Sequence, residues 1–210
     1  MSPQVVARKR AVIGQQEALY TLIEGAPPGA RYALQAADLR RTKELDAAVS
    51  ASGLDTGVPT LVLLECVLAY LEPQDAASLL SWAATKFPTS VVVTYDPTRP
   101  HDPFGRQMLL NLQARGCPFR SISAAPDPEA LMVRLHACGW SRAECCDMNA
   151  VYTTFLEPSS RRAAERLELL DEVEEWHLML GHYALAVGVN DPQGVLAGVT
   201  LAAGQGGATT

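Results

Sequence analysis

The sequence has little of three features: long apolar runs, runs of basic residues and paired cysteines. No stretch of about 20 apolar residues is present, so no membrane-spanning helix is predicted. The longest basic run is Arg8-Lys9-Arg10 and the net charge is −6, which argues against electrostatic binding to nucleic acid. The first residues show no signal-peptide pattern. Together these absences predict a cytoplasmic protein, either cytosolic or nuclear.

Cysteine, histidine and glycine patterns also give no catalytic or metal site. The five cysteines are odd in number and include no Cys-x-x-Cys pair, so we expect free thiols. The four histidines show no matching spacing, and no metal ligand set is predicted. Gly-x-Ser-x-Gly and Gly-x-x-x-x-Gly-Lys-Ser/Thr are absent, as is an early Gly-x-Gly-x-x-Gly. We therefore predict no catalytic nucleophile.

What the sequence does contain is an alternation of short apolar runs and amphipathic segments. Helical spacing and capping residues predict helices over residues 2–13, 42–52, 73–87, 104–115, 130–137 and 159–180. Apolar runs predict strands over residues 32–37, 59–67, 90–94, 142–148 and 182–189. This order indicates an α/β fold with a mostly parallel sheet and helices on both faces. In such folds, ligands bind beyond the carboxyl ends of the strands.

Burial can be predicted for some of these segments. The runs 60–64 and 91–93 are continuously apolar, so both strands are expected to be buried on their two faces. Within the predicted helix 159–180, Leu167, Leu170 and Val173 are expected to face inward. Residues 191–210 end in a run rich in glycine and are predicted to form a loose tail.

Asp38 directly follows a predicted strand. Its carboxylate could accept hydrogen bonds from an adenine amino group, while the amide of Leu39 donates to a ring nitrogen. The alternative is an ordinary solvated aspartate in a turn.

Glu65 ends a run of apolar residues, and a buried lone carboxylate is costly. A bound cation, such as the ammonium of an amino-acid-like cofactor, would compensate it. The alternative is a rim residue paired with a nearby lysine or arginine. Tyr70 and Tyr95 flank the same end of the sheet and could shape a substrate pocket, although such tyrosines more often pack at the edge of a core.

An ordered series of motifs resembles the leucine carboxyl methyltransferase family. The central block is Pro59–Leu71, with Glu-Cys-Val-Leu-x-Tyr after an apolar strand. The other matching segments are Ala36–Arg40, Asp102–Met108, Asn111-Leu112, Gly139-Trp140, Asp147-Met148, Leu170–Glu174 and His182-Tyr183. The resemblance runs from about Val5 to Gly188, and the series is more specific than any single block.

The resemblance implies a fold, a cofactor and a reaction. The fold is a class I, Rossmann-like sheet that binds S-adenosyl-L-methionine. The reaction is methylation of the C-terminal leucine carboxylate of the type 2A protein phosphatase catalytic subunit, which would be the partner. By the same resemblance, Asp38 and Leu39 would bind the adenine and Glu65 would contact the cofactor. The carboxylate is already ionised at neutral pH, so catalysis would depend mainly on alignment.

The family places two strands and a glycine-rich turn ahead of the segment that matches the start of this chain. We therefore expect residues 1–190 to be the C-terminal part of one N-terminally truncated domain that alone binds the cofactor poorly. Two alternatives stay open beside the protein methyltransferase. One is a family member that acts on transfer RNA or a small carboxylic acid, and the other is an inactive fragment or non-catalytic binding module.

Overall fold

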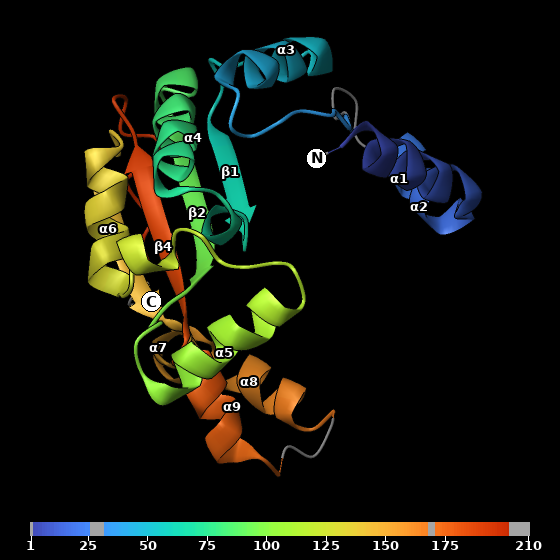
Figure 1. Ribbon diagram of the computed structural model, residues 1–210. Helices are drawn as coiled ribbons and strands as arrows, with labels where there is room; N and C mark the ends of the chain where they lie inside the picture. The colour runs from blue at the N-terminus through green and yellow to red at the C-terminus, as the bar shows by residue number, and fades with distance from the viewer. Residues whose placement is uncertain (1, 26–31, 168–170, 202–210) are drawn as a thin grey trace, which may run out of the picture. The chain divides into compact units, whose positions relative to one another are not determined.

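The computed structural model describes residues 2–25, 32–167 and 171–201. The chain forms two compact units, Met1–Asp55 and Thr56–Thr210 (Figure 1). No helix within the described residues is long and apolar enough to cross a membrane.

The first unit contains three helices. Helix α1 (Pro3–Gln15) begins as predicted, with the Ser2 hydroxyl accepting a hydrogen bond from the Val5 amide. Helix α2 (Glu17–Glu24) follows directly and was not predicted. Helix α3 (Thr42–Ser52) ends at Gly53, whose φ of 68° is the left-handed conformation that glycine adopts readily. The predictions for α1 and α3 are therefore confirmed.

The predicted strand over residues 32–37 does not form. Residues 32–38 are irregular. A strand needs a neighbour to pair its backbone groups, and the described residues of the first unit contain no other strand. The prediction failed because an apolar run alone does not supply a hydrogen-bonding partner.

The second unit is built on a four-stranded sheet. Its strands are β1 (Thr60–Glu65), β2 (Ser90–Pro97), β3 (Arg142–Asp147) and β4 (Tyr183–Asn190). Their order is β1-β2-β4-β3, with β1 parallel to β2 and β4 antiparallel to both β2 and β3. All four strands were predicted, but the sheet is mixed and not mostly parallel. The last strand, β4, lies between β2 and β3 and runs antiparallel to both. The order of elements along the chain does not reveal this.

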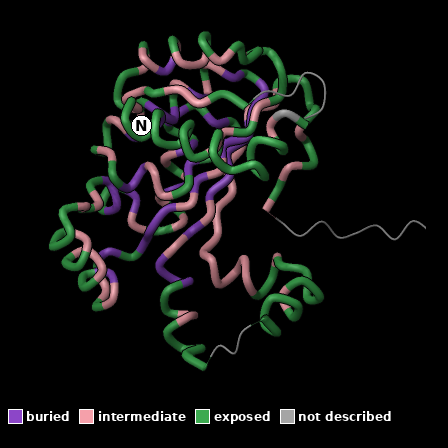
Figure 2. The backbone as a smooth tube through the Cα atoms, turned by 90° about the vertical axis from the view of Figure 1, so that its right-hand side faces the viewer, coloured by how far each residue is buried: buried purple, intermediate pink, exposed green. Residues whose placement is uncertain are grey.

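Helices α4 (Pro73–Lys86) and α6 (Pro128–Ala137) lie side by side on one face of this sheet, where Cys138 Sγ donates to the Ala77 carbonyl at 3.5 Å. Val92 and Thr94 of β2 are fully buried. The core therefore sits between β2, β4 and these two helices, where Figure 2 shows the purple segments.

The opposite face of the sheet is covered unevenly. Leu196, Val199 and Leu201 pack against a cluster of Val91, Val187 and Val189. Residues 191–201 are thus part of the packed unit and not a loose tail, while residues 202–210 lie outside the described residues.

The β1 end of the same face is open, since Leu61 is 65% exposed and Leu63 is 60% exposed. The prediction of a doubly buried strand is therefore wrong for β1, which is an edge strand. It holds for β2, whose residues are buried or half-buried along its whole length.

The predicted long helix over residues 159–180 is two helices. Helix α8 (Pro158–Glu165) and helix α9 (Val173–Leu180) are separate. Leu167 is 87% exposed and Val173 is 47% exposed, while Leu170 lies outside the described residues. The apolar stripe finds no surface to pack against at these two positions, and helices of this length depend on such packing.

The remaining elements of the second unit are helices and short turns outside the sheet. They are α5 (Pro103–Ala114), α7 (Met148–Ala150), the π-helical turn Val151–Phe155, and the 3₁₀ turns Leu68–Tyr70 and Ile122–Ala124. Asp102 caps α5 by accepting a 2.7 Å hydrogen bond from the Gly105 amide. Gly116, two residues beyond the end of α5, has a φ of 74° and turns the chain away, in agreement with the predicted stop.

Candidate functional site

Strand β1 ends in a strained turn. Cys66 has a φ of 49°, which is uncommon for a residue with a side chain. Its amide donates a 2.8 Å hydrogen bond to the Tyr95 carbonyl, so the turn is fastened to the neighbouring strand. This turn leads directly into the Leu68–Tyr70 turn and brings Tyr70 beside the carboxyl end of the sheet. Backbone strain of this kind is concentrated at functional sites.

Glu65 occupies the last position of β1. Its side chain is exposed, because residue 65 lies on the open face of an edge strand. No described residue forms a hydrogen bond or an ion pair with its carboxylate. The prediction that Glu65 is buried is therefore wrong, and the alternative of a nearby lysine or arginine partner is not met among the described residues. The carboxylate is available to an incoming group, and its contact with a bound cation stays a prediction.

A cavity of about 320 Å³ lies next to this turn. It is bounded by Cys66 and Tyr70 on one side, by the length of α5 on another, and by Tyr183 at the start of β4. Its size is at the lower end of the range of about 300–1,000 Å³ that is usual for small-molecule sites.

Aromatic contacts fix two walls of this cavity. The rings of Tyr70 and Phe119 meet edge to face with centroids 5.1 Å apart. Tyr183 stacks on Tyr95, with a centroid distance of 5.1 Å and an angle of 7° between the rings. Tyr70 therefore lines the cavity itself, whereas Tyr95 supports it from behind through Tyr183. The substrate role suggested for both tyrosines stays a prediction.

Burial favours the neutral forms of the titratable groups that line the cavity. It raises the pKa of the Tyr70 and Tyr183 hydroxyls and of the Cys66 thiol above their ordinary values. It also raises the pKa of Tyr95 to about 12, with the neighbouring Tyr183 as a second cause. Arg115, at the C-terminal end of α5, is then the one charged side chain among the residues that line the cavity.

Helix α5 is held in place by a buried histidine that the sequence analysis did not identify. His182 is 1% exposed, and its Nε2 lies 2.8 Å from an Asp102 carboxylate oxygen. Its Nδ1 lies 2.8 Å from the Leu178 carbonyl of α9. Both residues belong to motifs that carry the family resemblance, so the signal was present but no role was assigned. The contact joins α5, α9 and β4 at one end of the sheet.

Asp96 follows Tyr95 in β2 but faces the other side of the sheet. Its carboxylate is buried and lies 3.0 Å from a guanidinium nitrogen of Arg134 in α6. Burial nevertheless raises the pKa of Asp96, and Arg134 opposes that shift. This ion pair packs α6 against the sheet and does not reach the cavity described above.

Asp38 lies in the first unit, in a turn and not at a strand end. Arg40 holds its carboxylate through two side-chain nitrogens, the closer at 2.7 Å, and through its amide at 3.1 Å. These contacts keep the pKa of Asp38 well below its usual range. The Asp38 amide donates to Glu44 at 2.9 Å. No described residue accepts a hydrogen bond from the Leu39 amide, so that donor is available.

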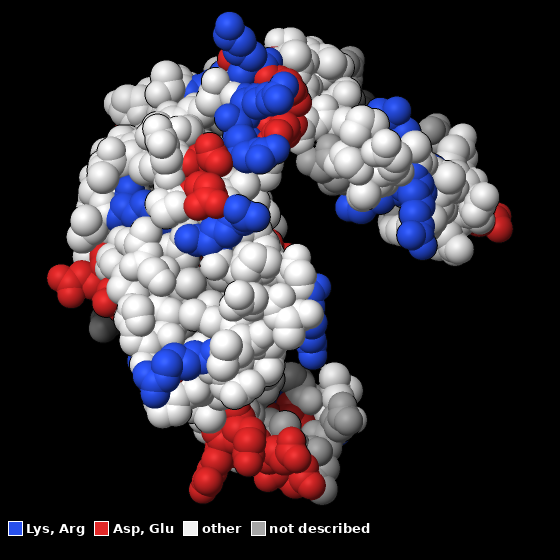
Figure 3. All heavy atoms as spheres, viewed as in Figure 1, with Lys and Arg blue, Asp and Glu red and all other residues white. Residues whose placement is uncertain are grey.

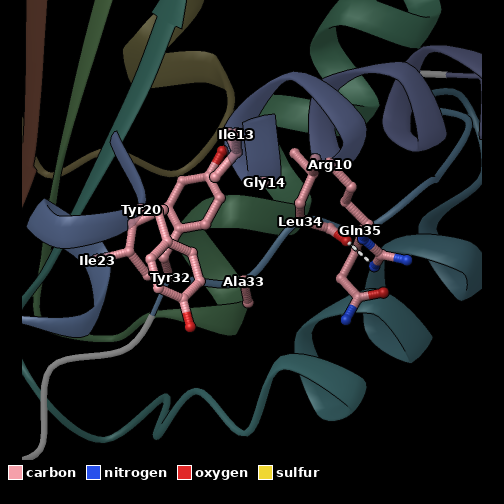
Figure 4. Close-up of a pocket in the computed structure, with 9 residues that line it drawn as sticks. All are labelled: Arg10, Ile13, Gly14, Tyr20, Ile23, Tyr32, Ala33, Leu34 and Gln35. Atoms are coloured by element: carbon pink, nitrogen blue, oxygen red, sulfur yellow. Dashed lines mark hydrogen bonds between the residues drawn. The ribbon is translucent and has the colours of Figure 1, made fainter. Parts of the chain in front are cut away.

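The first unit also has a cavity, of about 470 Å³, which does not include Asp38 in its lining. Figure 4 shows Tyr20 and Tyr32 side by side in it, with Ile13 and Ile23 nearby. The Arg10 guanidinium donates a 2.6 Å hydrogen bond to the Leu34 carbonyl, which leaves the cavity mainly aromatic and aliphatic.

Metal-ligand groups and disulfides are both absent among the described residues. The described residues contain no group of three or more His, Cys, Asp or Glu side chains that could hold a metal ion. All five cysteines are free thiols, as predicted.

Solved structures share this fold. A DUF574 family protein from Streptomyces avermitilis superposes with a TM-score of 0.54 at 17% identity, covering 82% of this chain and 62% of the other. A protein from Thermobifida fusca that is assigned as a methyltransferase gives a TM-score of 0.56 at 14% identity, covering 90% and 60%. With its mixed sheet, the chain thus has the α/β fold of class I S-adenosylmethionine-dependent methyltransferases.

Sequence comparison points to one family of methyltransferases. Residues 2–84 match the leucine carboxyl methyltransferase family. The leucine carboxyl methyltransferase 1 homolog of Arabidopsis thaliana is 37% identical over 201 residues, covering 91% of this chain and 60% of that protein. Rat leucine carboxyl methyltransferase 1 is 32% identical over 195 residues, covering 87% and 58%. The chain is a relative of this family, as its motifs predict.

A third relative is named for a different process. Human tRNA wybutosine-synthesizing protein 4 is 39% identical over 191 residues, which is 86% of this chain but 28% of that protein. The chain spans about 60% of the length of the Arabidopsis relative and a smaller share of the human one.

Proposed function

We propose that this chain forms part of an S-adenosyl-L-methionine-dependent methyltransferase that modifies a protein C-terminus. The acceptor is the α-carboxylate of the C-terminal leucine of the type 2A protein phosphatase catalytic subunit. The observation that carries the proposal is the family match over residues 2–84, which includes the Asp38-Leu39 turn and the end of β1. The cavity beside that strand end supports it, since it offers a neutral, partly aromatic wall and one cation.

Three residues named in the family resemblance have groups that suit parts of the cofactor. The unpartnered Glu65 carboxylate suits an ammonium group, and the available Leu39 amide suits an adenine ring nitrogen. Asp38 can accept from an adenine amino group by sharing its carboxylate with Arg40. When bound, the cofactor supplies an electrophilic methyl group on its sulfonium.

The proposed transfer needs no acid or base from the protein. The leucine carboxylate is ionised at neutral pH and attacks as it stands. Its oxygen forms a bond to the methyl carbon while the carbon–sulfur bond breaks, and the electron pair of that bond remains on sulfur. The chain's task is then to hold the acceptor in line and away from water. A site without an ionised nucleophile agrees with this.

A methyl-transfer assay tests the proposal. The acceptors are two peptides of one sequence that end in leucine, one with a free carboxylate and one amidated, and the donor carries a labelled methyl group. The assay uses this chain and an extended version, which carries at its N-terminus the two strands and the glycine-rich turn that the family resemblance places ahead of this segment. We expect base-labile label in the free acid with the extended version, and no such label in the amidated peptide. Equal labelling of both peptides, or no transfer by the extended version, would contradict the proposal.

A second candidate is modification of transfer RNA, which the human wybutosine-synthesizing relative suggests. The charge of this chain does not favour it. In the view of Figure 3, acidic side chains gather around α9, and the basic ones on the second unit are scattered and form no patch. Label incorporated into bulk transfer RNA, and absent from the peptide, would select this candidate over the first.

A further inference from the structure

The charge of the cavity beside β1 comes from Arg115. No described residue accepts a hydrogen bond from its guanidinium. Other arginines of the second unit are already engaged: Arg99 with Asp147, Arg106 with the His101 carbonyl, Arg120 with Glu72 and Arg134 with Asp96. Arg115 therefore differs from these in offering its donors to the space that it lines.

The surface next to Arg115 is apolar. Met108 and Leu112 follow one face of α5, and Phe104 and Phe119 extend that surface across the cavity. All four are half-buried, so their exposed parts form the walls. Covering such an apolar wall with an aliphatic side chain is favourable, because it removes apolar surface from water.

Two amides complete the polar part of the cavity. Gln107 Nε2 donates a 2.9 Å hydrogen bond to Asn111 Oδ1, so the pair is already oriented along α5. That bond uses one Gln107 donor and leaves the Asn111 amide nitrogen available toward the same space. The cavity thus combines a guanidinium, an available amide donor and an apolar wall.

We propose that Arg115 binds the α-carboxylate of an apolar C-terminal residue, whose side chain covers Met108 and Leu112. The inference rests on the proposed function and names the group that recognises its acceptor. A guanidinium can hold a carboxylate through two parallel hydrogen bonds, which positions the oxygens as well as attracting the charge. The neutral tyrosines and thiol around it add no competing negative charge. A peptide amide or a methyl ester would lose the ionic part of this contact.

Binding of labelled peptides tests the assignment on the full chain. A fluorescein-labelled peptide ending in leucine is titrated by fluorescence anisotropy as the free acid and as the amide. We expect the free acid to bind about tenfold tighter or better, the range for a hydrogen bond to a charged group. Arg115→Gln should bring the two affinities together. Arg106→Gln, on the same helix but outside the cavity lining, should keep the preference.

The outcomes separate this inference from the proposed function. Equal affinity for acid and amide, a preference that survives in Arg115→Gln, or no saturable binding of either peptide would each overturn the assignment of Arg115. Methyl transfer is scored independently with the extended version. If transfer is unchanged in Arg115→Gln, the inference is rejected and the proposed function stands. If binding depends on Arg115 but no transfer occurs, the proposed function is rejected and the inference stands. Arg115 is exposed, so unfolding curves of the variants should coincide with that of the parent.

Discussion

His182 Nε2 lies 2.8 Å from the Asp102 carboxylate, although 80 residues separate the two in sequence. The same carboxylate caps α5 through the Gly105 amide, so one side chain fixes both the start of the helix and a buried ring. Because α5 supplies a whole wall of the cavity, this contact positions the site without being part of its lining.

Substitutions at Asp102 should separate its two tasks. Asp102→Ala removes the cap, which costs about 0.5–2 kcal/mol, and leaves a buried ring nitrogen unpaired, which costs about 1–3 kcal/mol more. Asp102→Asn retains an N-cap oxygen and should lose clearly less. Urea unfolding of the chain measures both variants. Equal stability of the alanine variant and the parent would show that the contact does not hold α5.

The same carboxylate predicts a pH dependence. Capping by Gly105 and the contact with His182 hold the pKa of Asp102 below its ordinary value. The folded state therefore binds this proton less readily than the unfolded state. The resulting stability is present above the unfolded pKa, about 4, and is lost as the pH falls through the lower folded pKa. Stability measured from pH 6 down to pH 3 should fall less steeply in Asp102→Asn than in the parent. Parallel curves would contradict the assignment.

Strand β1 shows what the sequence can and cannot say about this fold. Its extent was predicted well, because apolar β-formers and flanking breaks are local signals. Its burial was not, since a run of leucine and valine looks the same at the centre and at the edge of a sheet. The segment 32–37 failed for the same reason, as its character as a strand depends on a partner elsewhere. Contacts such as Asp102–His182 and Arg134–Asp96 join distant segments and leave no local pattern.

The open face of β1 leads to a prediction for neighbouring leucines. Leu64 is 8% exposed beneath the helices, whereas Leu61 and Leu63 point to the open face. Leu64→Ala should cost about 2–5 kcal/mol through lost burial and a cavity. Leu61→Ser and Leu63→Ser should each change stability by less than about 0.5 kcal/mol. Urea unfolding of the three variants measures this contrast. A large loss in either serine variant would mean that the face is covered in solution.

Glu65 gives the sharpest test of how the cofactor is held. An exposed, unpartnered carboxylate at the end of β1 can bind an ammonium group through a charged hydrogen bond. In the extended version, Glu65→Gln should therefore weaken the binding of S-adenosyl-L-methionine by about tenfold or more, the range for a charged hydrogen bond. Isothermal titration measures this. The stability of the Glu65→Gln variant should equal that of the parent, because the Glu65 side chain lies in solvent.

A truncated ligand separates this contact from general damage to the site. 5′-Methylthioadenosine keeps the adenosine but lacks the amino-acid portion, so Glu65→Gln should bind it as the parent does. Glu72→Gln, which alters a carboxylate paired with Arg120 at 2.6 Å, serves as the matched control and should affect neither ligand. If Glu65→Gln weakened both ligands equally, the carboxylate would act on the shape of the turn and not on an ammonium group. If it weakened neither, Glu65 would have no part in holding the cofactor.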